Sequence, residues 1–415
     1  MIRGQKIWLN LSLKHFVLNS SMKKVVRFLR GKFKNFDHVY CIMKSLQADC
    51  TYYFINKVRI FFKKTIVPSE VEILDIIRVK IHARRVNLGW PKKELHILLI
   101  YGLSNWEWIL PMAFSRFGKV HVFDWRAEGY DDRVVSDWPS SRHKLNQSLI
   151  EKFHQINSIE KIDVVIGQFS GYTIMPETID EIKAGGAITI NWTFDDKLNF
   201  KGKKMFGVQS SPAGLCDAVD ITLTSNPSAI RQYWSFGGLS MFVPEAAEHN
   251  FFKRSNQKKY KVTFVGARYG NRPKFISDLK KYGVDVECFG VGWKNGEISD
   301  IRMAEIFSQS LINIGMSEIG YSKKLCCLKA RDFEIPLCGS LYLTSYHSDL
   351  DLVYEIGKEI LVYRNAKDCA ALIKKILNNP LEYESISKEG FRRASLNHTY
   401  EARWSVVFKK IGAII

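Results

Sequence analysis

The sequence predicts an α/β protein with two doubly wound, Rossmann-like domains that face a cleft, and a basic helical extension at the N-terminus. Three observations predict this fold class. Short apolar segments alternate with helical segments, the alternation starts a second time after a polar break, and most of the net charge of +19 lies near the N-terminus. Such alternation favours parallel sheets with helices on both faces. The length of 415 residues suits two or three domains.

The N-terminal part carries most of the charge, because residues 1–94 hold 20 Lys and Arg against 6 Asp and Glu. Residues 1–66 mix these cations with Phe, Val, Ile and Leu, which is typical of short basic helices. Such a face can lie on an anionic membrane, where each cation contributes about 1 kcal/mol. It can equally pack on the main body with solvated lysines. Charge alone is compatible with nucleic acid, but no nucleic-acid motif accompanies it.

The first alternating series follows this extension, which we assign to residues 1–93. It predicts an N-terminal Rossmann-like domain over residues 94–247. Its expected strands are apolar and its expected helices amphipathic, which suits a sheet buried on both faces. The clearest strand segments are LHILLIYG, KVHVFDW, KIDVVIGQF, AITINWTFDD and AVDITLTSN.

A second series begins after the polar break at 249–260 and predicts a C-terminal Rossmann-like domain over residues 248–397. Ligands of such sheets bind at the carboxyl ends of the strands. The remaining residues, 398–415, are expected to form a C-terminal helix that could cross back to the N-terminal domain. The strand segments of this series are KVTFVGA, VDVECFGVGW, LINIGMS, SLYLTSY and EILVYRN.

The cysteines and the N-terminus favour a cytoplasmic protein. None of the eight cysteines forms a C-x-x-C pair, and Cys326 and Cys327 are adjacent, which disfavours an ordinary disulfide. Lys14 and His15 interrupt the apolar run near the start, so no secretory signal is expected. No apolar run reaches the ~18 residues that a spanning helix needs. The histidines are scattered without ligand spacing, so no metal site is expected.

The turn GARYGNR (266–272) is the first candidate binding site. Gly266 ends a predicted strand, and the next helix begins near Pro273. Backbone N–H groups at a helix start favour an anion, and Arg268 and Arg272 add two forked cations. The combination suits a diphosphate. The alternative is a tight turn with two solvated arginines.

The GVGW segment is a weaker signal. Gly290 and Gly292 follow a strand without the full G-x-G-x-x-G spacing, and they allow close approach of a ligand or of another backbone. Trp293 could stack on a sugar or a base, or simply be a buried aromatic side chain.

The segment KARDFEIPLCGSLYL (329–343) places Lys329, Arg331 and Glu334 within one and a half helical turns. A carboxylate here can accept two hydrogen bonds from a ribose diol. The alternative is an Arg331–Glu334 ion pair, which the spacing alone slightly favours.

Two acidic pairs, Asp131–Asp132 and Asp195–Asp196, could hold a metal or supply a base. No other metal-like signal accompanies either pair.

Several blocks of the sequence resemble the CgeB-type glycosyltransferases, the spore-maturation-protein-like or DUF3880-like members of the GT-B fold. These blocks are 264–293, 329–363 and 398–404, and 180–196 is also similar. Their order and spacing match over about residues 95–410, which leaves residues 1–93 uncovered.

The resemblance implies a GT-B fold, no bound metal or other cofactor, and a nucleotide-sugar donor, with UDP and GDP both open. Gly266, Arg268 and Arg272 match the loop that faces the diphosphate, and Lys329 and Arg331 lie near it. Glu334 matches the carboxylate that binds the donor ribose. Gly290, Gly292, Trp293 and Ser317 complete the expected donor-side set. The family often carries a second glutamate eight positions earlier, where this sequence has Cys326, so retaining and inverting outcomes both stay open.

The expected function is glycosyl transfer to an acceptor hydroxyl of a saccharide, a lipid-linked sugar or a protein, in cell-surface polysaccharide, glycolipid or glycoprotein synthesis. The acceptor is expected near Gly102, Asn105 and Trp106, with Asp195 or Asp196 as base. The expected location is the cytoplasm, including the inner face of the plasma membrane. Two alternatives stay open: a nucleic-acid-associated protein, such as a DNA-base glycosyltransferase, and a nucleotide-sugar-binding relic without catalysis.

Overall fold

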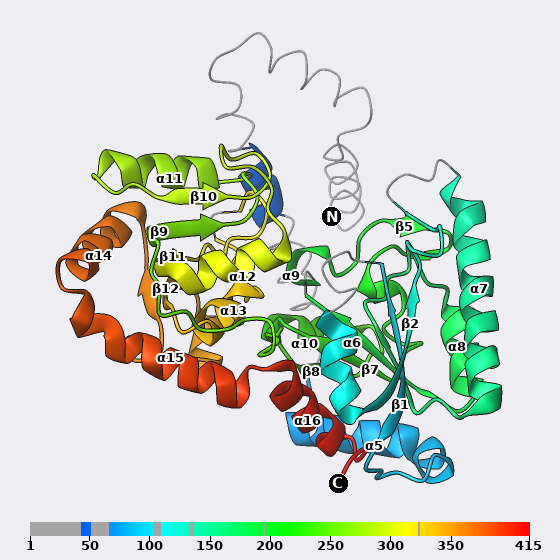
Figure 1. Cartoon of the computed structure of the whole chain (residues 1–415). Helices are drawn as coiled ribbons and strands as arrows, with labels where there is room; N and C mark the ends of the chain where they lie inside the picture. The colour runs from blue at the N-terminus through cyan, green and yellow to red at the C-terminus, as the bar shows by residue number, and fades with distance from the viewer. Residues whose placement is uncertain (1–42, 51–65, 103–108, 133–136, 195, 323) are drawn as a thin grey trace.

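The computed structural model describes residues 43–50, 66–102, 109–132, 137–194, 196–322 and 324–415. Two parallel sheets dominate it, as Figure 1 shows. Most of residues 1–66, the predicted membrane-binding segment, lies outside the described residues. Residues 43–50 are helical, and the Asp49 carboxylate accepts a hydrogen bond from the Ser322 hydroxyl.

The first sheet has six strands, and every strand pair in it is parallel. Its central strands are fully buried, as their apolar sequences predicted. In spatial order the strands are β2 (Gly118–Asp124), β1 (Leu95–Tyr101), β3 (Val164–Gly167), β4 (Ile188–Thr193), β7 (Ile221–Thr224) and β8 (Ser240–Phe242). A separate antiparallel hairpin joins β5 (Lys204–Met205) to β6 (Val208–Gln209).

The second sheet has five parallel strands. In spatial order they are β10 (Glu287–Phe289), β9 (Tyr260–Val265), β11 (Ser310–Ile314), β12 (Leu341–Ser345) and β13 (Leu361–Tyr363). The chain order and the spatial order differ at β9 and β10: the chain runs outward from β9 to β10 and then crosses back to β11, so the sheet is wound in both directions from β9.

Helices cover both faces of each sheet (Figure 1). On the first sheet they are α5 (Glu70–Asn87), α6 (Ile109–Phe114) and α16 (Tyr400–Lys410) on one face, with α7 (Trp138–Ile159) and α8 (Pro176–Ala184) on the other. On the second they are α11 (Arg272–Lys281) and α14 (Ala366–Asn378) on one face, with α12 (Asp300–Gln309), α13 (Arg331–Leu337) and α15 (Glu384–Asn397) on the other. Two short helices, α9 (Asp196–Asn199) and α10 (Ile230–Ser235), and 3₁₀ turns at 115–117, 212–214, 227–229, 348–352 and 380–383 complete the fold.

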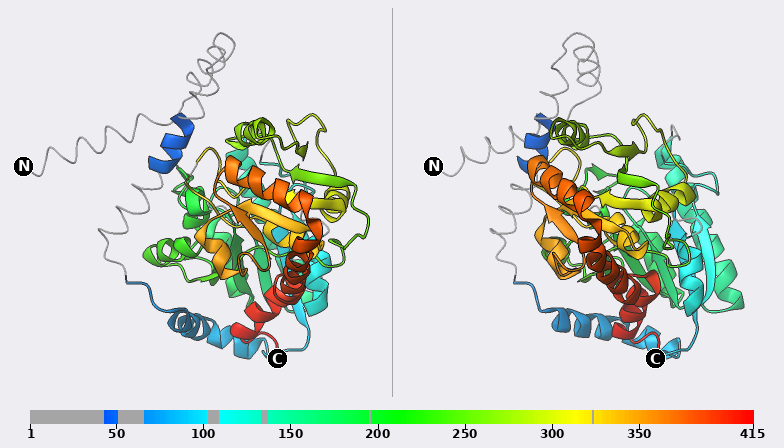
Figure 2. Two further views of the ribbon diagram at one scale, coloured as in Figure 1. Left: turned by 90° about the vertical axis from the view of Figure 1, so that its left-hand side faces the viewer. Right: turned by 60° about the vertical axis from the view of Figure 1, so that its left-hand side comes forward.

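The C-terminal helix α16 packs in the core of the first sheet. Trp404 is fully buried, and its ring lies edge-on to Trp192 at 5.3 Å and to Phe114 at 4.7 Å between centroids. Helix α5 contributes Ile77 and Ile81 to the same core. Figure 2 shows α5 and α16 side by side at one end of the molecule, where Arg78 Nε of α5 donates to the Lys410 carbonyl at 3.0 Å. The first core therefore joins α5, early in the chain, to the C-terminal helix α16.

Within the described ranges, no helix combines the length and the apolar character that crossing a bilayer requires.

Candidate functional site

The carboxyl ends of β9, β11 and β12 meet at one edge of the second sheet. The register pairs Thr263 of β9 with Asn313 of β11, and Ile314 of β11 with Leu343 of β12. Gly266 follows β9, while Ser317 follows β11. Ser317 is buried, and its backbone N–H donates to Ser345 Oγ at 2.9 Å. Adjacent strands lie about 4.8 Å apart. Gly266, Ser317 and Ser345 therefore lie side by side along this edge of the sheet.

Two arginine side chains converge on Gly266. A β-carbon placed on this glycine would lie 3.1 Å from Arg331 Nη2 and 3.3 Å from Arg272 Nη1. Both guanidinium groups lie 5.5 Å from the centre of the Phe264 ring. Arg272 Nη1 donates to the Ala267 carbonyl at 2.9 Å. Arg331 Nη1 is buried and has no hydrogen-bond partner among the described residues.

This guanidinium pair, Arg272 with Arg331, has the electrostatics of an anion site. Burial, followed by the positive charge of Arg331, lowers the pKa of Arg272 to about 10. Neither arginine forms an ion pair with a carboxylate in the described part of the chain. An anion placed between them would relieve the repulsion and accept charge-assisted hydrogen bonds. Residue spacing alone gave no sign that Arg272 and Arg331 meet, although the family resemblance placed both near the diphosphate.

The GVGW segment supports the turn that carries Gly266. Trp293 Nε1 donates to the Gly266 carbonyl at 2.8 Å, and the Arg268 guanidinium lies 5.7 Å from the Trp293 ring centre. Gly290 has φ of 119°, and a β-carbon there would lie 2.7 Å from the Gly266 carbonyl oxygen. A β-carbon on Gly292 would lie 3.1 Å from the Arg268 β-carbon. The sequence left two reasons for Gly290 and Gly292, close approach of a ligand or of another backbone. The structure shows another backbone segment, that of residues 266–268, close to both glycines.

Glu334 lies on α13, one turn beyond Arg331. Burial raises the pKa of its carboxyl to about 8, and the charge of Arg331 opposes that rise. The ion pair with Arg331 that spacing favoured is not among those of the described residues. The backbone N–H of Lys329 donates to Asp332 Oδ2 at 2.7 Å, which holds the start of the helix. Asp332 is fully buried, and its other oxygen accepts from the Tyr342 hydroxyl.

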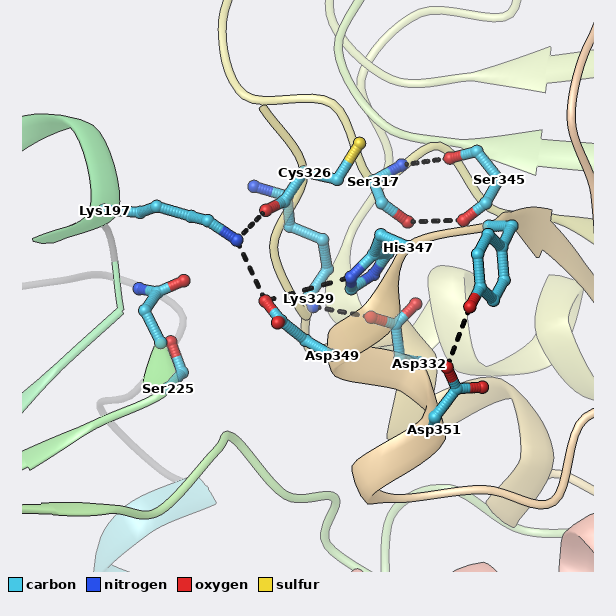
Figure 3. A network of polar contacts seen from close by, with 12 residues as sticks. Lys197, Ser225, Ser317, Cys326, Lys329, Asp332, Ser345, His347, Asp349 and Asp351 are labelled. Atoms are coloured by element: carbon cyan, nitrogen blue, oxygen red, sulfur yellow. Dashed lines mark hydrogen bonds and ion pairs between the residues drawn. The ribbon is translucent and has the colours of Figure 1, made fainter. Parts of the chain in front are cut away.

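A contact between the two sheets' domains was not predicted from the sequence. Lys197, on α9 of the first domain, donates to the Cys326 carbonyl at 2.6 Å and to Asp349 Oδ2 at 3.0 Å (Figure 3). Both side chains of the Lys197–Asp349 pair are 13% exposed. His347 Nδ1 lies 3.9 Å from the same carboxylate oxygen. Nothing in the sequence marks this pairing, because 152 positions separate Lys197 from Asp349.

Asp196 is 1% exposed, and four side-chain donors satisfy its carboxylate. Oδ2 accepts from the hydroxyls of Thr193, Thr224 and Tyr233, while Oδ1 accepts from the Asn226 amide at 2.5 Å. Burial raises its pKa, and these hydrogen bonds oppose the rise. The geometry favours a structural role that joins the ends of β4 and β7, rather than the predicted role of base.

The remaining acceptor-side residues are only partly described. Asp195, Asn105 and Trp106 lie outside the described residues. Gly102 follows β1, and a β-carbon there would lie 2.1 Å from the Trp125 ring. Asp131 and Asp132 lie 3.6 Å and 3.2 Å from Arg126 nitrogens, as ion pairs. Among the residues that the structure describes, no group of three or more His, Cys, Asp or Glu has the arrangement of a metal site.

The part of the chain that holds this site is similar to a known protein family. Residues 259–408 match a family model described as glycosyl transferase-like. No curated protein matches this sequence. The family match covers the second sheet, the guanidinium pair and Glu334, and it supports the predicted activity class of glycosyl transfer.

Three solved structures share the fold at low sequence identity. Sucrose-phosphate synthase from Thermosynechococcus elongatus has a TM-score of 0.54 and 11% identity, over 77% of this chain and 99% of that one. Anabaena Alr3699/HepE in complex with UDP-glucose has a TM-score of 0.52 and 11% identity, over 76% and 98%. A glycosyltransferase from Rickettsia africae has a TM-score of 0.51 and 10% identity, over 77% and 99%. The predicted GT-B fold is confirmed.

Proposed function

We propose that this protein transfers a sugar from a nucleotide-sugar donor to an acceptor hydroxyl. The observation that carries the proposal is the guanidinium pair at Gly266. Buried Arg272 and half-buried Arg331 share one position without a carboxylate partner in the described part of the chain. They lie at the carboxyl ends of the strands and within the glycosyl transferase-like region. An activated sugar carries its two phosphates as the leaving group, which is the anion that such a site suits.

The guanidinium pair would bind the diphosphate and stabilise the charge that develops on it as the glycosidic bond breaks. Each charge-assisted hydrogen bond of this kind contributes about 1.5–3 kcal/mol. It accelerates transfer only to the extent that it strengthens in the transition state. Arg268 is exposed at the same turn and would add a third cation. Lys329, half-buried at the start of α13, would contribute a fourth near the phosphates.

Glu334 would accept hydrogen bonds from the ribose hydroxyls. Its half-buried carboxyl lies near the charge of Arg331. The ribose would therefore bind next to the diphosphate, as it must in one nucleotide. A half-buried acceptor that forms no ion pair among the described residues is suited to a diol donor.

We assign the donor to the domain of residues 248–397 and the acceptor to that of residues 94–247, with residues 398–415 returning to the latter. The acceptor segment would include Gly102, Asn105 and Trp106. Since Asp196 is satisfied internally, Asp195 is the better candidate for the base. Cys326 takes the position of the family's first glutamate, and burial raises the pKa of its thiol to about 12, so it supplies no anion there.

The narrower assignment is a CgeB-like enzyme that works on cell-surface saccharides, glycolipids or glycoproteins at the cytoplasmic side of the membrane. The donor would be a UDP-sugar, as in the HepE structures that hold UDP, UDP and glucose, or UDP-glucose. The basic residues of the segment 1–66 would hold the enzyme on an anionic membrane surface.

The test is a screen of UDP- and GDP-sugars, with release of the nucleoside diphosphate as the readout. Arg331→Ala and Arg272→Ala should each lower kcat/KM for the active donor at least tenfold, because each removes a charge-assisted contact to the leaving group. Arg302→Ala is the matched control, since Arg302 is an exposed arginine of α12 paired with Glu305 at 2.7 Å. The proposal fails if the two site variants behave like the control.

A further inference from the structure

His347 lies just past the carboxyl end of β12 and is well buried, with a side chain 8% exposed. Neither of its ring nitrogens has a hydrogen-bond partner among the residues that the structure describes. Buried polar groups in folded proteins almost always have such a partner, and each exception calls for an explanation. A ligand that supplies the missing partner is one explanation.

A second buried histidine shows the contrast. His398 is 4% exposed, and both of its ring nitrogens are partnered. Its Nε2 lies 2.9 Å from the Val353 carbonyl oxygen, and its Nδ1 lies 3.0 Å from Arg403 Nη2. His398 therefore has the contacts of a structural histidine, which His347 lacks.

Four charged groups surround His347 (Figure 3). They are Asp349, which lies 3.9 Å from Nδ1, and Lys197, Lys329 and Asp351. Burial lowers the pKa of His347 to about 4, the two aspartates oppose this shift, and the two lysines add to it. The imidazole is therefore neutral near pH 7, with one N–H donor and one lone pair.

A neutral imidazole is complementary to a hydroxyl group, which both donates and accepts. A phosphate near pH 7 mainly accepts, and it is better matched by cations such as the guanidinium pair. The two sites thus differ in the chemistry that they recognise.

The order of the strands fits that division. Gly266 follows β9 and His347 follows β12, with β11 between these strands. Two strand spacings amount to about 10 Å. That span suits a diphosphate at one end and the sugar attached to it at the other.

We propose that His347 binds a hydroxyl group of the transferred sugar, and so helps to select and orient the donor. The inference rests on the proposed function, because it requires the diphosphate to lie at the guanidinium pair. Lys197 and Asp349 come from opposite domains and hold the loop that carries His347. The histidine would therefore contact the sugar where the acceptor domain meets the donor domain.

Calorimetry can separate this inference from the proposed function. The probes are UDP with UDP-glucose, UDP-galactose and UDP-N-acetylglucosamine, and GDP with GDP-mannose. For the nucleotide sugar that binds wild type, His347→Ala should weaken affinity at least tenfold, while affinity for the free nucleotide changes less than twofold. His347→Gln should recover part of the loss, because its amide offers both a donor and an acceptor.

His398→Gln is the matched control, and it should lower Tm without changing the ratio of nucleotide-sugar affinity to nucleotide affinity. The inference is overturned if His347→Ala leaves that ratio unchanged, whether both affinities fall together or neither falls. A higher KM for the acceptor with an unchanged ratio would place His347 on the acceptor and would also overturn it. Wild type that binds neither UDP nor GDP would overturn the proposed function itself.

Discussion

Buried ionisable side chains fall into two groups, and the difference lies in their partners. Asp196 is surrounded by four donors and Asp332 by two, so both carboxyls stabilise the fold. Arg331 Nη1 and both ring nitrogens of His347 are buried and have no hydrogen-bond partner among the described residues. An unpaired buried group destabilises the free protein by about 1–3 kcal/mol, and a ligand can remove that penalty on binding.

Glu334 carries a prediction about pH. Its folded pKa of about 8 exceeds the ordinary value of 4.5, so the folded state holds a proton that the unfolded state releases. Its contribution to stability is therefore complete below about pH 4.5 and is lost as pH rises to about 8. Glu334→Gln cannot ionise, so its Tm relative to wild type should rise steadily from pH 5 to pH 8 in thermal melts.

The same variant should also weaken nucleotide binding about tenfold at pH 8. At this pH about half of wild-type Glu334 is ionised, and its carboxylate accepts hydrogen bonds from the ribose more strongly than a neutral amide does. Glu305→Gln, at an exposed site of α12, is the control and should change neither property. A flat Tm difference over this pH range would show that Glu334 ionises normally. Unchanged nucleotide affinity would remove Glu334 from the ribose site.

At the scale of elements, the turn after β9 decides how closely a ligand approaches the guanidinium pair. Gly266 has φ of 149°, which L side chains rarely adopt, and its missing β-carbon leaves the space that both guanidinium groups border. The sequence predicted a glycine turn with two arginines here. Residue spacing alone could not show that Arg331 completes the site, because Arg331 belongs to α13, far along the chain; only the family resemblance placed it near the diphosphate.

Gly266→Ala should therefore weaken UDP or GDP binding at least tenfold, because the added methyl group crowds Arg272 and Arg331. Gly296→Ala is the matched control: Gly296 also has a positive φ, 71°, but nothing lies within 4 Å of its β-carbon position. It should lower stability by about 1–2 kcal/mol through backbone strain without changing affinity. Equal affinity losses in both variants would attribute the effect to strain alone. Calorimetry and thermal melts measure both quantities.

At the scale of the whole molecule, local patterns predicted the two sheets but not the contacts that join distant segments. Continuous apolar runs such as LHILLIY and LINI mark strands buried on both faces, and they alternate along the chain with helical segments. The fold class could therefore be predicted from the sequence. The packing of Trp404 against Trp192 and the Lys197–Asp349 pair join positions far apart in the chain. No periodicity records such pairs. For the same reason Asp196 could be identified as an acidic residue but not as a buried one.

The central claim is that the guanidinium pair holds the diphosphate of the donor. The measurement that tests it most directly is a crystal structure of the protein with the nucleoside diphosphate that binds, UDP or GDP. The account predicts phosphate oxygens within about 2.7–3.2 Å of both Arg272 and Arg331. A nucleotide bound elsewhere, with both guanidinium groups placed as they are now and no anion between them, would contradict it.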